Sequence, residues 1–193
     1  MEDRQLSGQE SLDLIARMLS ATRARIERGS GRPFLIWGYT TVVVSVAVWF
    51  AVTRTADPRW FWLWFALPAV ALPLTLLTNR PASVGARTYF DRVVGYVWWV
   101  CGSAGFLVSL LSSFFPLPVL FMIILIMGMG TALTGLVIRF PVCAVTGFVS
   151  MALSLLCLIF GGIDGILVFA AVFVVMMIIP GHILQHKCAA RTR

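Results

Sequence analysis

The most suggestive reactive side chains in this chain are two histidines and a cysteine close to its C-terminus. His182 and His186 lie four residues apart, and Cys188 follows them. If a helix continues past Pro180-Gly181, both imidazoles lie on one of its faces, at a spacing that can hold zinc, copper or haem iron. No Asp or Glu follows position 164 to orient either imidazole. We therefore predict a polar turn here, with no metal site and no cofactor.

Groups that could act in catalysis are scarce elsewhere. Hydrolysis inside a membrane needs paired Asp side chains, a Ser with a His, or Glu and His around zinc. The apolar runs between Phe34 and Phe160 contain no Asp, Glu, Lys or His in their interiors, and the chain has no phosphate-binding loop, G-x-S-x-G or H-E-x-x-H motif. We expect that the protein is not an enzyme.

Asp164 and the cysteines are predicted to have structural roles. Asp164 lies among glycines, so we predict that it caps the following helix instead of binding a cation. Cys101, Cys143 and Cys157 are isolated within apolar runs, and we expect them to be free thiols, as is Cys188.

The composition places the chain in a membrane. Hydrophobic residues make up 60% of it, charged residues make up 12%, and the mean hydropathy is +0.93. Soluble domains have about 45–50% apolar and about 25% charged residues. The lipid bilayer is therefore the first expected partner, and the net charge of +7 requires no nucleic acid.

Six apolar runs, which contain no charged residue except Asp164 near the start of the last, are long enough to cross a bilayer, which takes about 20 apolar residues as a helix. They are Phe34 to Val52, Phe61 to Leu77, Val93 to Phe115, Leu117 to Ile138, Val142 to Phe160, and Ile163 to Ile179. The predicted fold is an all-α, polytopic transmembrane bundle of six spans. Its parts are a cytoplasmic amphipathic helix with a linker (residues 1–33), the bundle (34–180) and a basic cytoplasmic tail (181–193).

The orientation follows from the distribution of Lys and Arg. Alternate connecting segments and both terminal segments carry 13 of these residues, whereas the opposite side has only Arg54 and Arg59. Both termini are therefore predicted to be cytoplasmic.

The N-terminal segment has the pattern of a helix. Ser7-Gly8-Gln9-Glu10 has the spacing of a capping box, and Gly29-Ser30-Gly31 is expected to end the helix after Arg28. A narrow apolar stripe runs along it, formed by Leu12, Ile15, Leu19 and Ile26, with Thr22 in the same line. Such a stripe favours packing against a second copy or a cytoplasmic protein, because helices that lie on lipid have broader apolar faces. A helix on the membrane surface is the alternative.

Small residues and aromatic residues mark the spans. Close helix packing is predicted at the glycines of the third and fourth spans, namely Gly95, Gly102, Gly128, Gly130 and Gly135. The run Trp60-Phe61-Trp62-Leu63-Trp64-Phe65 is interpreted as anchoring the second span at the membrane surface, and stacking on a ligand is the alternative.

Several short segments together resemble a known family. They are Glu10-Ser11-Leu12, Gly128-Met-Gly-Thr-Ala-Leu-Thr-Gly135, Arg139-Phe140-Pro141, and Ile179-Pro180-Gly181-His182-Ile183-Leu184. The chain resembles a family of uncharacterised six-span integral membrane proteins from Bacteroidota. The resemblance implies this architecture and a bacterial inner membrane, and it implies no reaction.

Two functions are compatible with these patterns. The leading hypothesis is a non-enzymatic inner-membrane protein whose bundle anchors a cytoplasmic interaction helix in a regulatory or scaffold role. The alternative is a small channel or transporter for an uncharged or hydrophobic solute, which predicts a cavity between Thr40, Thr41, Ser45, Ser103 and Thr134.

Overall fold

The computed structural model describes residues 8–78 and 89–190, and within these ranges the chain forms helices and no strands. The elements are α1 (Gly8–Thr55), the 3-10 helix η1 (Pro58–Phe65), α2 (Ala66–Thr78), α3 (Tyr89–Leu111), α4 (Val119–Val137), α5 (Pro141–Leu153), α6 (Leu156–Ile159), α7 (Gly165–Phe173), the π-helical turn η2 (Val174–Ile178) and α8 (Ile179–Ala190). The predicted all-α class is confirmed.

Six helical segments of the described chain are long and apolar enough to cross a membrane. They are Gly31–Thr55, Pro58–Thr78, Arg92–Leu111, Val119–Val137, Pro141–Ile159 and Gly165–His186. Each overlaps one of the six predicted runs, so the protein is a multi-pass membrane protein. The last span extends beyond Ile179 because the helix continues through Pro180-Gly181.

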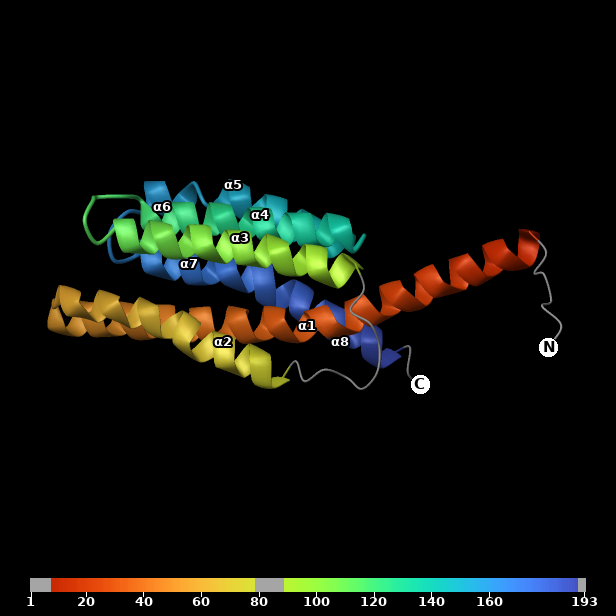
Figure 1. The fold of residues 1–193 in the computed structure, drawn as a ribbon. Helices are drawn as coiled ribbons and strands as arrows, with labels where there is room; N and C mark the ends of the chain where they lie inside the picture. Colours follow the sequence, from red (N-terminus) through yellow and green to blue (C-terminus); the bar gives the residue numbers. More distant parts are fainter. Residues whose placement is uncertain (1–7, 79–88, 191–193) are drawn as a thin grey trace.

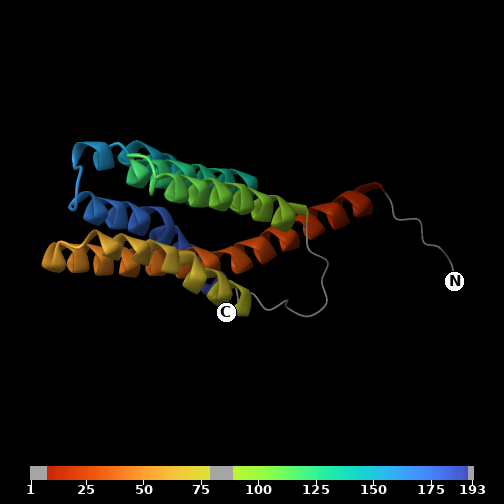
Figure 2. The same ribbon diagram turned by 60° about the vertical axis from the view of Figure 1, so that its left-hand side comes forward.

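The bundle has two distinct ends (Figure 1). One end, which we call the terminal end, lies toward the N-terminus and the C-terminus, and the opposite or distal end carries the α1–η1, α3–α4 and α6–α7 connections. Figure 2 shows α7 between a layer made by α3, α4 and α5 and a layer made by α1 and α2. The helix α7 contacts both α1 and α4, and it therefore joins the two layers.

The helix α1 is longer than expected. It runs without a break through Gly29-Ser30-Gly31 and Pro33, so the predicted stop after Arg28 is wrong. A Cβ built on Gly31 would lie 3.3 Å from the carbonyl oxygen of Gly181 and 3.3 Å from Cβ of Leu184. Gly31 therefore serves close approach of α8 to α1, and it does not end the helix.

Asp164 and Asp57 occupy similar positions with different bonding. Asp164 is the N-cap residue of α7, as predicted, but its side chain makes no capping hydrogen bond; its backbone carbonyl accepts from the Leu167 N–H at 3.0 Å. Asp57 is the N-cap of η1, and its Oδ1 accepts from the Arg59 N–H at 2.9 Å. The second carboxylate thus fixes the turn from α1 into η1.

Candidate functional site

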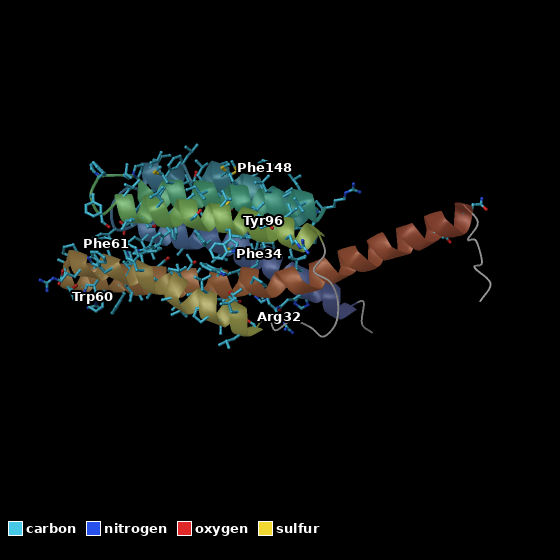
Figure 3. The ribbon with its side chains drawn as sticks, viewed as in Figure 1. Arg32, Phe34, Trp60, Phe61, Tyr96 and Phe148 are labelled. Carbon is cyan, nitrogen blue, oxygen red and sulfur yellow. The ribbon has the colours of Figure 1, made fainter. Side chains whose placement is uncertain are left out.

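The functional candidate in the described part of the chain is a cleft of about 660 Å³ within the membrane-spanning part of the bundle. We call it the α3 cleft. One wall is formed by η1 and the start of α2, the other wall by the distal half of α3, and the floor by α7, α4 and part of α1. Figure 3 shows Phe61, which lines the cleft, on the side of η1 toward α3, and Trp60 on the opposite side.

The two walls meet through aromatic side chains. The Phe65 ring of η1 lies edge-on to Phe106 of α3, with 6.3 Å between centroids, and Phe34 of α1 meets Trp98 of α3 at 5.6 Å. Between these contacts, α3 packs along α4. The cleft is therefore a gap between α3 and the span formed by η1 and α2. These two spans touch through aromatic rings but do not pack along their length.

An aromatic cluster joins the floor of the α3 cleft to η1. Phe169 of α7 is 1% exposed and contacts the Trp64 ring edge-on at 5.1 Å and the Phe173 ring at 4.6 Å. These contacts hold η1 against α7, so the aromatic run of the second span does more than anchor the span at the membrane surface.

The α3 cleft has apolar walls and a few hydroxyl groups. Ser109, Ser112 and Ser113 lie along its α3 side, and the Ser109 and Ser112 hydroxyls donate to carbonyl oxygens of their own helix at 2.9 and 2.8 Å. None of the described residues that line it is charged. The site therefore has no group suited to acid, base or metal chemistry, and it is suited to binding an apolar molecule.

Gly95 and Gly102 were predicted to be packing positions, and this prediction is wrong. A Cβ built on either glycine would meet no atom within 4 Å. Gly102 is exposed and lines the α3 cleft, and Gly95 lies two turns away toward the terminal end. The small residues of α3 leave space there because α2 is not packed against this face.

The other three glycines do lie at close contacts. Gly130 faces the sulfur of Cys101 on α3, 3.1 Å from a built Cβ; Gly128 faces Met151 of α5; and Gly135 lies against the backbone of Ala144. Their partner glycine on α5 is Gly147, which was not predicted; a Cβ built on it would lie 2.5 Å from the Ala132 backbone nitrogen. The spacing of Ala144, Gly147 and Ser150, one every three residues, was the available signal.

The five hydroxyl residues predicted to line a transporter cavity do not gather at the α3 cleft. Of these five, only Thr41 lines the α3 cleft. The other four hydroxyls donate to carbonyl oxygens of their own helices: Thr40 to Ile36, Ser45 to Thr41, Ser103 to Val100, and Thr134 to Gly130, at 2.6 to 2.9 Å. These bonds satisfy the hydroxyls within each helix, so the side chains need not gather.

The histidines lie on α8, where it runs beside α1. The His182 Nε2 is 2.7 Å from the Tyr39 hydroxyl of α1. Among the described residues, no three His, Cys, Asp or Glu side chains come together in a group that could hold a metal ion. His182 therefore links two helices, and His186, one turn further on, is exposed.

The remaining predicted site residues are Leu12, Ile15, Leu19 and Ile26. The backbone of α1 includes them, but their side chains lie outside what the structure describes.

The chain matches no protein-family model, no curated protein and no solved structure. The resemblance to six-span proteins from Bacteroidota stays a prediction.

Proposed function

We propose that this protein is a non-enzymatic bacterial inner-membrane protein whose bundle anchors the N-terminal part of α1 as a cytoplasmic interaction helix. Both termini would lie in the cytoplasm, as the distribution of Lys and Arg predicts. The role would be regulatory or that of a scaffold.

The observation that supports this proposal is the unbroken helix α1. Its residues 8–30, about 35 Å of helix at 1.5 Å per residue, precede the membrane span and project from the terminal end of the bundle (Figures 1 and 2). A continuous helix fixes the direction of this segment relative to the membrane, whereas a glycine joint would let it lie flat on the lipid. This geometry favours binding to protein over binding to the membrane surface.

The contact between α1 and α8 reinforces the base of the projecting segment. Gly31 approaches Gly181 and Leu184, and a built Cβ on Gly181 would in turn lie 2.8 Å from Leu35. The hydrogen bond between Tyr39 and His182 lies two turns further along α1. A force or binding event on the projecting segment would therefore be transmitted to two spans.

The stripe on the projecting segment supplies the test. Leu19→Asp combined with Ile26→Asp should abolish association with a second copy or with a cytoplasmic protein, because four aligned aliphatic side chains gain about 1.5–3 kcal/mol each on full burial. Association is measured in the full-length protein by cross-linking through a single cysteine at position 15, in a background without the native cysteines, and by co-purification in mild detergent.

A matched control is Ser20→Asp with Ala24→Asp, which adds the same charge outside the stripe. This control should associate like the parent protein, and both variants should insert normally in the membrane. Unchanged cross-linking and co-purification in the Leu19→Asp, Ile26→Asp variant would overturn the proposal, as would tight binding of a peptide of residues 7–28 to anionic vesicles.

The second candidate function is a carrier for an uncharged or hydrophobic solute. The α3 cleft favours it, since the cleft is apolar and large enough for a small molecule. A solute carrier should retain its uptake activity in the Leu19→Asp, Ile26→Asp variant, and this separates it from the interaction helix.

A further inference from the structure

We propose that the α3 cleft is a phospholipid site, which holds one acyl chain between η1 and α3 and binds the lipid phosphate through Arg59 at its distal rim. The inference gives the second candidate function a ligand class, and it is independent of the role proposed for the N-terminal part of α1.

The walls of the α3 cleft select an apolar occupant. Phe61 and Trp62 of η1 face Phe106 of α3 across it, and the buried rings of Phe169 and Phe173 form its floor. Water inside would lose hydrogen bonds, because few polar atoms line the cleft. An acyl chain gives up no hydrogen bond by entering, because the lining is as apolar as the bilayer core from which it comes.

The size of the cleft favours an acyl chain over a helix from another protein. A helix with its side chains is at least about 10 Å across, so about 8 Å of its length would already fill the cleft of about 660 Å³. A single acyl chain is thin and flexible enough to follow a gap that runs from the α3–α4 loop, at Phe115, down to Thr41 and Met177 of the floor.

A cation suited to a phosphate directly adjoins, in the chain, a residue that lines the distal rim of the cleft. Arg59 directly follows Pro58, which lines the cleft at the distal end of the second span, and Arg59 is exposed. Its backbone N–H is held by Asp57, and its guanidinium makes no hydrogen bond or ion pair within the described part of the chain. The other distal arginine, Arg54, already lies over the Phe50 ring at 5.2 Å. Guanidinium groups bind phosphate through paired, charge-assisted hydrogen bonds.

Gly102, on the α3 wall of the cleft, leaves space for the acyl chain. It lines the cleft, and a built Cβ would meet nothing within 4 Å, so a larger side chain fits there without disturbing the bundle. Gly95 is equally open, lies seven residues earlier on the same side of α3, and does not line the cleft. The pair provides a test variant and a matched control on one helix.

The experiment uses the full-length protein in phosphatidylcholine vesicles with a small amount of phosphatidylglycerol that carries a photoreactive diazirine in the middle of one acyl chain. After illumination, cross-linked peptides are quantified by mass spectrometry. Labelling of α7 at Ile166, Phe169 and Phe173, which are buried and line the cleft, reports the occupied cleft. Labelling at Phe148 of α5, which is 55% exposed, reports the lipid that surrounds the bundle (Figure 3).

The expected result is labelling of α7 in the parent protein that falls several-fold in Gly102→Leu and is unchanged in Gly95→Leu, while labelling at Phe148 stays constant in all three. Arg59→Gln should also lower labelling of α7 several-fold, and Arg54→Gln should not. Absent labelling of α7 in the parent, or equal labelling in Gly102→Leu, would overturn the site. A loss in Gly102→Leu without any effect of Arg59→Gln would overturn the phosphate contact and with it the assignment to a phospholipid.

These outcomes are separate from those that test the interaction helix. The cleft variants change no residue of the projecting segment, and the stripe variants change no residue that lines the cleft. Failure of either proposal therefore leaves the other standing on its own measurement.

Discussion

At the scale of single residues, four buried hydroxyl groups of the spans are paired within their own helices, whereas that of Ser150 is not. Ser45, Thr131, Thr134 and Ser154 are buried, and each donates to a backbone carbonyl oxygen three or four residues earlier in its own helix, at 2.6 to 2.9 Å. Ser150 of α5 is fully buried as well, but its Oγ has no hydrogen-bond partner among the described residues. An unpaired buried hydroxyl destabilises the folded state.

Ser150→Ala should therefore raise the free energy of unfolding, or leave it unchanged, because an unpaired buried polar group costs up to about 1–3 kcal/mol. Ser154→Ala is the matched control, since it removes a hydroxyl that donates to the Met151 carbonyl at 2.6 Å and should not stabilise the protein. The measurement is the midpoint of thermal unfolding in one detergent. A lower midpoint for Ser150→Ala than for Ser154→Ala would mean that the Ser150 hydroxyl has a partner in the folded protein.

At the scale of elements, the tightest association is the hairpin of α4 and α5. Three pairs lie opposite one another along it: Gly128 with Met151, Ala132 with Gly147, and Gly135 with Ala144. The turn between the helices is closed by a hydrogen bond from the Phe140 N–H to the Gly135 carbonyl at 2.8 Å. The Gly135 carbonyl thus accepts the hydrogen bond that closes the turn, and the absence of a side chain at Gly135 allows the backbone of α5 to lie against it.

Gly147→Ala and Gly135→Ala should each destabilise the bundle, since the added methyl group would lie against backbone atoms that cannot move aside. Overpacking of this kind costs about 1–3 kcal/mol. Gly102→Ala is the control on a helix with open space, and it should unfold at the temperature of the parent protein or slightly above it, because alanine also favours the helix. Equal midpoints for all three variants would contradict the packing argument.

The glycines also show where sequence reasoning about elements stops. The spacing of Gly128, Ala132 and Gly135 indicated a contact face because small residues on one face of a helix allow close approach. The same reasoning failed for Gly95 and Gly102, since a small residue serves equally well to leave a space. It failed again at Gly29-Ser30-Gly31, where the approach of α8, which is distant in sequence, decided that the helix continues.

At the scale of the whole molecule, the span count and the all-α class could be predicted, and the α3 cleft could not. A bilayer requires about 20 apolar residues per helical span with every backbone group paired, so the runs of the sequence map directly onto the helices. The cleft depends on how far α2 and α3 stand apart. That distance is set by the packing of η1 on α7 through Trp64 and Phe169, which no local pattern encodes.

The last prediction concerns the orientation of the whole bundle. In the sequence, both terminal segments and the alternate connecting segments contain 13 of the 15 Lys and Arg residues, and the opposite connecting segments contain Arg54 and Arg59. Because Lys and Arg in short loops remain cytoplasmic, a reporter fused after Arg193 should be active in the cytoplasm, and a reporter inserted at Thr55 should be active on the opposite side. Each reporter is read with one enzyme that works only in the cytoplasm and one that works only outside it.

A C-terminal reporter active outside would reverse the orientation, and it would place the projecting part of α1 where no cytoplasmic partner could reach it. Opposite locations for a reporter after Arg193 and one before Gly8 would instead require an odd number of spans.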